Sequence, residues 1–151
     1  MSLTEDIRLL TQVPLFRDMN DDQLRLVAFG AEHRPVVTGQ ELFRERSPAE
    51  SAFIVARGRF ELLTADRNGE MKVQATVGPG TLLSELALVT MVERKFTAIA
   101  VEDSEALKIS RSLFYRLLEE YPEVGRMIES RIRDNISTLA KAAAAMGHRF
   151  A

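Results

Sequence analysis

The distribution of hydrophobic and polar positions divides the chain into three parts, of which the first is helical. Residues 3–31 carry apolar side chains at helical spacing, interrupted at Pro14. This spacing predicts two short helices. Asn20 is typical of the N-cap of the second helix, and Gly30 is expected to end it. Thr4 is the N-cap that we expect for the first helix.

Between residues 34 and 109 the pattern changes to short apolar and β-branched runs separated by turn residues. Ser51–Ala56 is one such run, and the pair Asn68-Gly69 is typical of a β-hairpin. About eight strands at near-regular spacing are predicted in this way. This spacing favours a mainly β, α+β fold, an eight-stranded antiparallel β-roll or jelly roll, over alternating parallel strands and helices.

Residues 110–147 are predicted to form two C-terminal helices. Ser110 or Ser112 is expected to cap the first, and Pro122 to begin the second. Apolar residues recur every three or four positions along the second helix and predict a stripe that faces the core or a second copy of the chain: Ile128, Ile132, Ile136, Leu139, Ala143 and Met146. The charged residues of this helix are expected on a solvated face: Arg126, Arg131, Arg133 and Lys141.

The composition is that of a single globular domain, residues 1–151. The chain is 46% apolar and 28% charged with a net charge of −2, which gives it no general attraction to nucleic acid. It has no cysteine, which excludes disulfides, thiolate metal ligands and a cysteine nucleophile. The two histidines, His33 and His148, are too few for the clustered ligands of a metal-dependent β-roll enzyme, so neither a metal nor a catalytic residue is predicted. No apolar run approaches the roughly 20 residues of a membrane span and no signal peptide is evident, so we expect a cytoplasmic protein.

One segment carries the chemistry of a binding site. Gly78-Pro79-Gly80 predicts a tight turn, and the run from Leu83 to Leu88 follows it, with Glu85 in the first turn of a predicted helix. The Glu85 carboxylate can accept a hydrogen bond from a sugar hydroxyl, and the guanidinium of Arg94 offers phosphate oxygens a fixed fork of donors. The free amides of the helical turn add further donors and a favourable dipole for an anion. Glu85 could also be an acid that stabilises a helix N-terminus, but this alternative predicts nothing about Arg94, so we favour contact with a ligand.

The segment resembles the phosphate-binding cassette of cyclic nucleotide-binding domains, in which Phe-Gly-Glu-Leu-Ala-Leu precedes Arg-Ala-Ala. The order of helices, β-roll and C-terminal helices is also similar to that family over nearly the whole chain. The resemblance implies that Glu85 accepts the ribose 2′-hydroxyl and that Arg94 binds the phosphate of a cyclic mononucleotide such as cAMP. The further ligand-binding residues that it implies, through backbone N–H groups on the phosphate or apolar side chains around the base, are Ser84, Leu86, Lys95, Val73 and Leu83.

The chain departs from the family's pattern at three positions. Ser84 stands where the family has glycine, and a serine there costs about 1–2 kcal/mol if the backbone needs a positive φ. This substitution concerns affinity more than fold. Lys95 and Phe96 replace small residues. Lys95 cannot provide the guanine preference that a serine or threonine would indicate, and Phe96 either crowds the pocket or turns into the core.

The first hypothesis is a non-catalytic regulatory module that binds cAMP or cGMP between Glu85 and Arg94 and forms a homodimer through residues 123–146. In the empty protein we expect Arg94 to pair with Glu93 or Glu85. A second hypothesis is the effector domain of a catabolite-activator-type transcription regulator whose DNA-binding domain lies outside this chain. A third is an interaction protein with a degenerate pocket that binds no nucleotide and acts through its last helix.

Overall fold

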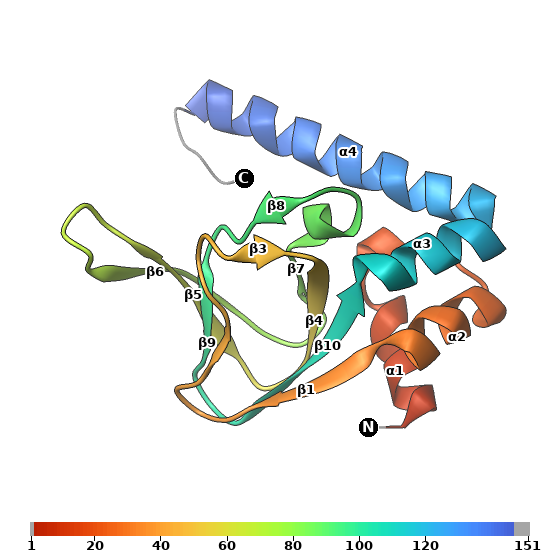
Figure 1. Ribbon diagram of the computed structural model, residues 1–151, viewed down its shortest axis with the longest axis horizontal. Coiled ribbons are helices and arrows are strands. Elements are labelled where there is room, and N and C mark those ends of the chain that lie inside the picture. The colour runs from red at the N-terminus through yellow and green to blue at the C-terminus, as the bar shows by residue number, and fades with distance from the viewer. Residues whose placement is uncertain (1, 147–151) are drawn as a thin grey trace.

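The structure, a computed structural model, is a β-roll flanked by helices from both ends of the chain (Figure 1). It describes the backbone of residues 2–146 and the side chains of residues 2–135. The helical elements are α1 (Leu3–Thr11), η1 (Pro14–Phe16), α2 (Asp21–Gly30), η2 (Glu85–Leu88), α3 (Arg111–Glu120) and α4 (Pro122–Met146). The strands are β1 (Glu32–Val36), β2 (Glu41–Phe43), β3 (Pro48–Ala49), β4 (Ser51–Arg57), β5 (Phe60–Ala65), β6 (Met71–Val77), β7 (Leu82–Leu83), β8 (Val92–Glu93), β9 (Thr97–Ala100) and β10 (Ser104–Ser110).

The strands form two four-stranded antiparallel sheets, ordered β1-β10-β4-β7 and β2-β9-β5-β6, and a small sheet of β3 and β8. The predicted antiparallel β-roll with helices at both ends is therefore confirmed. The described residues contain ten strands, where the sequence predicts about eight. Three of the ten, β3, β7 and β8, have only two residues each, too few to show the alternation of polar and apolar positions from which strands are predicted.

The start of α1 corrects one prediction. Ser2 is the N-cap, and its hydroxyl accepts a hydrogen bond from the amide of Glu5 at 3.2 Å. Thr4 lies inside the first turn, because α1 begins at Leu3. The caps of the other two short helices are as predicted.

Asn20 caps α2 in a full capping box, in which it accepts from the amide of Gln23 at 3.0 Å while the Gln23 side chain accepts from the Asn20 amide at 2.9 Å. Ser110, rather than Ser112, caps α3 by accepting from the amide of Leu113 at 3.1 Å. Both caps are local contacts between residues three apart, which is why the sequence is sufficient to predict them.

Strand β4 separates two hydrophobic cores because its side chains alternate between two covered faces. Phe53 and Val55 point into the roll, where they pack with Phe60 and other residues of the strands. Ala52 and Ile54 face the other way, into a core formed with the helices. A strand that is buried on both faces has a nearly continuous apolar sequence, as Ser51–Ala56 does.

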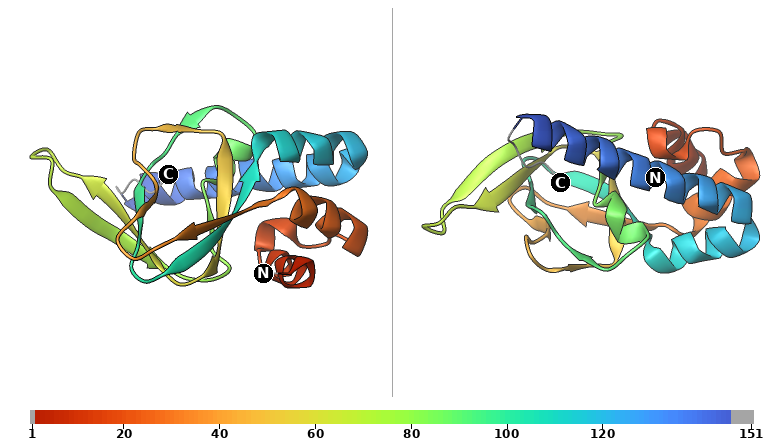
Figure 2. Two further views of the ribbon diagram at one scale, coloured as in Figure 1. Left: turned by 60° about the horizontal axis from the view of Figure 1, so that its bottom comes forward. Right: turned by 90° about the horizontal axis from the view of Figure 1, so that it is seen from above.

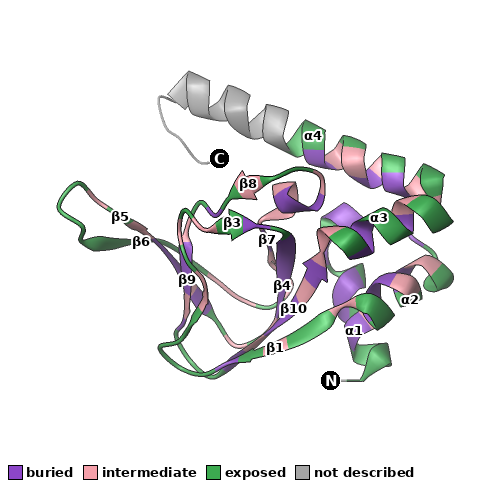
Figure 3. Cartoon of the chain, viewed as in Figure 1, coloured by how far each residue is buried: buried purple, intermediate pink, exposed green. Residues whose placement is uncertain are grey.

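Helix α4 is anchored by the first part of its apolar stripe. Ile128 and Ile132 are fully buried in the helical core, as the sequence predicts, and the burial colours of Figure 3 show this covered face. The remaining stripe residues, from Ile136 onward, lie outside the residues whose side chains are described. Arg131 is not on a solvated face: it donates to the carbonyl oxygens of Leu15 and Arg17 at 3.2 and 2.6 Å.

The β5–β6 hairpin projects from the body of the roll, while α1, α2 and α3 gather at the opposite end (Figures 1 and 2). Gly69 in its turn has a φ of 81°, the conformation that the Asn68-Gly69 pair predicts. Within residues 2–146, no helix is both long and apolar enough to cross a membrane.

Candidate functional site

The predicted binding segment enters the site through a turn that is fixed on β4. Gly80 has a φ of 88°, and its amide donates to the carbonyl of Val55 at 2.8 Å. The amide of Val55 donates in turn to the backbone carbonyl of Thr81 at 2.9 Å. Strand β7 then pairs with β4, with Leu83 opposite Phe53. These bonds set the position from which the following turn, η2, begins.

Ser84 links β7 to η2 in the left-handed conformation, with φ 64° and ψ 39°. The positive φ that the family's glycine implies at this position is therefore present, and a serine occupies it. The turn η2 is a 3₁₀ helix in which the amide of Ala87 donates to the carbonyl of Ser84 at 3.0 Å. The amides of Glu85 and Leu86 precede this first bond, so they are the donors that the turn can present to an anion.

The Glu85 carboxylate lies between η2 and α4. Its Oε2 is 3.5 Å from the side-chain nitrogen of Asn135 on α4, and no closer side-chain donor to it occurs among residues 2–135. Burial raises the pKa of Glu85, and the contact with Asn135 opposes that shift. A half-buried carboxylate with one long hydrogen bond has acceptor capacity left for a ligand hydroxyl.

Arg94 is buried, with 7% of its surface exposed, and its guanidinium binds β4. One terminal nitrogen donates to the carbonyl oxygen of Ser51 at 2.7 Å and the other to the Ser51 hydroxyl at 3.0 Å. The expected ion pair with Glu93 or Glu85 is wrong: within residues 2–135 no carboxylate lies within 4.0 Å of this guanidinium. Two neutral oxygens of one serine take the place of a carboxylate.

Two aromatic rings cover the Arg94 guanidinium. Its central carbon lies 4.7 Å from the ring centre of Phe43 and 5.3 Å from that of Phe53, distances typical of cation–π contacts. Because Phe53 pairs with Leu83, the residue before Ser84, these contacts bring Arg94 to the start of the binding segment. Burial lowers the pKa of Arg94, and the nearby Glu50 charge opposes that shift.

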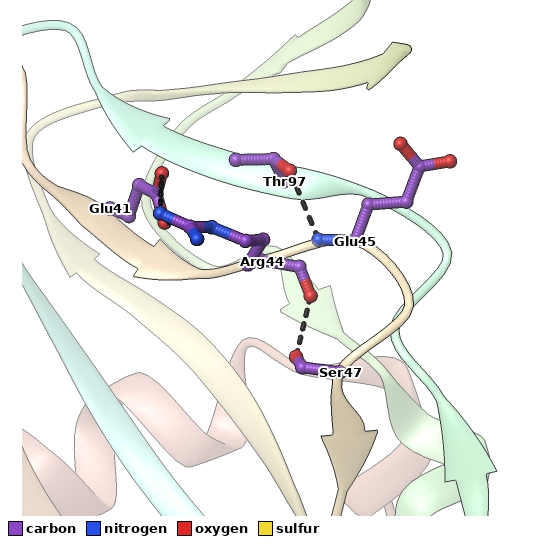
Figure 4. Close-up of polar contacts among 5 residues, drawn as sticks. All are labelled: Glu41, Arg44, Glu45, Ser47 and Thr97. Carbon is purple, nitrogen blue, oxygen red and sulfur yellow. Dashed lines mark hydrogen bonds and ion pairs between the residues drawn. The ribbon is translucent and has the colours of Figure 1, made fainter.

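The backbone of Arg94 is held by the loop between β2 and β3. Its amide donates to the carbonyl of Ser47 and its carbonyl accepts from the amide of Arg46, both at 2.8 Å. The loop is tied in turn to β9, because the amide of Glu45 donates to the hydroxyl of Thr97 at 3.0 Å (Figure 4). The position of Arg94 is thus set by backbone bonds, and its side chain by Ser51 and the two rings.

The other predicted ligand-binding residues fall in different environments. Leu83 is buried in the core of the roll, and Leu86 is half-buried against the helical core. Lys95 is exposed. Val73 is 52% exposed on the projecting hairpin, where it pairs with Leu63 rather than with a strand next to η2. Phe96 packs against the core of the roll, so it turns into the core and does not crowd the pocket.

Three residues at the site were missed by sequence reasoning: Ser51, Asn135 and Arg111. Ser51 is 1% exposed, and the only signal is a hydroxyl at the start of an apolar strand. Asn135 lies 50 residues from Glu85 in the sequence, and nothing local marks it. Arg111 does have a signal, because a cation in the first turn of a helix opposes the helix dipole.

The described residues hold no cluster of three or more histidine, aspartate or glutamate side chains that could bind a metal ion. The site instead offers a carboxylate acceptor and two free amides on one short turn, and a buried guanidinium over Phe53, the strand partner of the Leu83 that precedes this turn. Such a set can bind a ligand that carries hydroxyl and phosphate groups.

Comparisons with known proteins identify several relatives of this chain. The lysophospholipase NTE1 of Chaetomium globosum is 32% identical over 140 residues, which are 88% of this chain but only 9% of that protein. A cyclic nucleotide-binding-like protein from Brucella abortus is 42% identical, with a TM-score of 0.70, over 76% of this chain and 98% of that structure. The regulatory domain of Toxoplasma gondii PKA, crystallised with cAMP, is 26% identical, with a TM-score of 0.70, over 76% of this chain and 44% of that structure.

The family comparison covers the roll and the start of the C-terminal helices. Residues 33–121, more than half of the chain, match the cyclic nucleotide-binding domain, and these residues include β4, η2 and Arg94. With the β-roll, the short turn at Glu85 and the arginine after it all in place, the chain belongs to the cyclic nucleotide-binding domain family.

Proposed function

We propose that this chain is a non-catalytic regulatory module that binds a cyclic mononucleotide, cAMP or cGMP, between Glu85 and Arg94. The observation that carries the proposal is the presence of three kinds of group near the start of η2: the Glu85 carboxylate, the amides that precede the first bond of the turn, and the Arg94 guanidinium over the ring of Phe53, the strand partner of Leu83. The Toxoplasma relative, which was crystallised with cAMP, supports this ligand class.

Glu85 is proposed to accept a hydrogen bond from the ribose 2′-hydroxyl. Burial raises its pKa, so the ionised carboxylate is poorly solvated in the empty site. A ribose hydroxyl supplies the donor that water supplies elsewhere, and it can displace the 3.5 Å contact with Asn135. The amides of Ser84, Leu86 and Lys95 are proposed to donate to the phosphate together with the free amide of Glu85, and Leu83 and Val73 are proposed to contact the base.

Arg94 is proposed to bind the phosphate without leaving β4 entirely. A guanidinium has five N–H donors, and Ser51 accepts from only two of its nitrogens, one bond each. The remaining donors can reach phosphate oxygens while the bond to the Ser51 carbonyl persists. A charge-assisted bond to phosphate is stronger than the bond to a serine hydroxyl, so the ligand gains more than the protein loses.

The proposal is tested by calorimetric titration with cAMP and with cGMP, using wild type, Arg94→Ala and Arg94→Lys. A matched control is Arg44→Ala, since Arg44 is an exposed arginine in the same region whose partner is Glu41. Wild type is expected to bind at least one nucleotide with micromolar affinity, about −8 kcal/mol, with loss in both Arg94 variants but not in the control. If folded wild-type protein gives no heat with either nucleotide, the proposal is wrong.

The output of the module is proposed to be α4, which contacts Glu85 through Asn135 and is buried in the core at Ile128 and Ile132. A ligand that replaces the Asn135 contact favours one position of α4 over another. We propose that residues 123–146 also form the contact of a homodimer. Light scattering at high protein concentration tests this, and a monomer at all concentrations would contradict it.

The same proposal places the module in the cytoplasm, where cyclic mononucleotides act as messengers. With a net charge of −2 we expect no direct binding of nucleic acid by this chain. A gel-shift assay with duplex DNA, in the presence and absence of cAMP, is expected to show no complex.

A further inference from the structure

The side chain of Arg111, the first residue of α3, makes four polar contacts with residues outside its own helix. Its Nε donates to the carbonyl of Ala87, a buried residue of η2, at 2.8 Å. One Nη donates to the carbonyls of Thr90 and Ala49 at 2.9 and 2.8 Å. The other Nη lies 3.3 Å from the sulfur of Met91. Three of these four contacts are with residues 87–91, which lead out of η2.

The local requirements of α3 do not explain this arginine. Ser110 already caps the helix, and a cation at the N-terminus opposes the helix dipole. An arginine at this position therefore lowers the intrinsic stability of α3. The contacts with the carbonyls of Ala87, Thr90 and Ala49 compensate for that cost, because charge-assisted hydrogen bonds are stronger than neutral ones.

Three consecutive residues connect Arg111 with the proposed phosphate-binding arginine. Ala49 accepts from the Arg111 side chain, and the carbonyl of Glu50 accepts from the Arg111 amide at 2.9 Å. Ser51 accepts from both terminal nitrogens of Arg94. The two guanidinium groups are thus bound to one short chain segment, that of Arg111 to the carbonyl of Ala49 and that of Arg94 to Ser51 two residues later.

We propose that Arg111 is a positioning residue that fixes η2 to α3, so that the free amides of Glu85 and Leu86 are held ready for the phosphate and a shift of η2 is passed to α3 and α4. Arg111 itself does not touch the ligand. The step that involves a nucleotide rests on the function proposed above, whereas the fixing of η2 is a property of the empty protein. The two parts are therefore measured separately.

The fixing of η2 is tested without ligand by hydrogen exchange of wild type, Arg111→Ala and Arg111→Lys. The matched control is Arg131→Ala, because Arg131 also donates to two backbone carbonyls, but these are the carbonyls of Leu15 and Arg17 at η1 and not those of η2. In Arg111→Ala the amides of Val89 and Thr90, which donate to the carbonyl of Leu86, are expected to exchange about tenfold faster. Lysine has one nitrogen in place of three and is expected to restore only part of the protection.

The positioning of the amides is tested by titration of the same four proteins with cAMP and cGMP. Arg111→Ala is expected to bind about tenfold more weakly than wild type, while Arg131→Ala binds as wild type does. In wild type, the ligand is also expected to change exchange in the first turns of α4, and this change is expected to be lost in Arg111→Ala.

Each outcome decides one of the two proposals. Unchanged exchange at Val89 and Thr90 in Arg111→Ala would overturn the positioning role, as would an equal loss of affinity in Arg131→Ala. If Arg111→Ala does not fold, Arg111→Lys takes its place, and wild-type exchange and affinity in that variant would also overturn the role. A folded wild type that binds neither nucleotide overturns the proposed function instead, and the exchange experiment still tests whether Arg111 fixes η2.

Discussion

Replacement of Ser84 by glycine is expected to stabilise the protein, because Ser84 holds a left-handed backbone with φ 64° and ψ 39°. A residue with a Cβ is destabilised by about 1–2 kcal/mol in this conformation, and glycine is not. Glycine in turn makes the unfolded chain more flexible, which costs about 0.4–1 kcal/mol. The difference leaves a net gain of about 0.8 kcal/mol in the free energy of unfolding. The Ser84 side chain does not cap η2, so no helix cap is lost with it.

Urea denaturation measures this change, with Ser84→Ala as the control. Alanine keeps the Cβ and removes only the hydroxyl, so the strain remains and no gain is expected. The slope of the free energy against urea must stay the same in all three proteins for the midpoints to be compared. A Ser84→Gly variant that is no more stable than wild type, or an alanine variant that is equally stabilised, would refute the reasoning.

The same variant separates the cost of strain to folding from its cost to binding. Ser84 has its positive φ in the protein without ligand, so the strain exists before a nucleotide arrives. A cost that is present in both the free and the bound state cancels in the binding equilibrium, so the effect of Ser84 is expected on the stability of the fold and not on affinity, the reverse of the expectation from the sequence. We therefore expect Ser84→Gly to bind cyclic nucleotide with an affinity within about threefold of wild type, as measured by calorimetry.

Three further predictions follow from burial and backbone geometry. Burial raises the pKa of the Glu85 carboxyl, and Asn135 opposes that shift. The protonated carboxyl therefore contributes stability that is fully present at pH values below the ordinary pKa of 4.5 and is lost as the pH rises through the raised pKa. Glu85→Gln is therefore expected to gain stability relative to wild type across that rise, measured by urea denaturation at a series of pH values, while binding of cyclic nucleotide weakens. Gly58→Ala places a Cβ 2.8 Å from the Cα of Ser104 at a φ of +83°, and is expected to cost at least about 2 kcal/mol in the free energy of unfolding. Ile132→Ala removes a fully buried side chain of α4 and is expected to cost about 2–5 kcal/mol, with faster hydrogen exchange along α4 as the second readout.

Much of the fold could be predicted because its signals are local. Asn20 caps a helix three residues away, and Gly69 turns a hairpin whose strands adjoin it. The alternation of β4 between two cores likewise appears in the sequence as one apolar run. The position of Ser84 could also be anticipated, since the expected positive φ follows from the glycine that the family has there. These features depend on contacts within a few residues, and the sequence displays both partners at once.

The contacts that define the site were not predictable in this way, because each joins residues far apart in the sequence. Arg94 was expected to find a carboxylate nearby, but its partner is Ser51, 43 residues earlier, and the rings that cover it are on β2 and β4. A charge in a largely apolar environment takes whatever acceptors the surrounding backbone provides, and the serine carbonyl is one that no residue pattern marks.

The choice of partner also bears on function. Had Arg94 formed an ion pair with Glu85, a phosphate would first have to break an attraction between full charges, and the carboxylate would be lost to the ribose at the same time. Because Arg94 binds Ser51 instead, several N–H groups of its guanidinium remain available for a phosphate, and Glu85 remains able to accept a hydrogen bond from the ribose. In the empty protein each of the two charged groups is thus free for its own part of the ligand. A double variant tests this: the losses in nucleotide affinity for Glu85→Gln and Arg94→Lys are expected to add within about 0.5 kcal/mol. Direct pairing of the two groups in the empty protein would make the losses strongly non-additive.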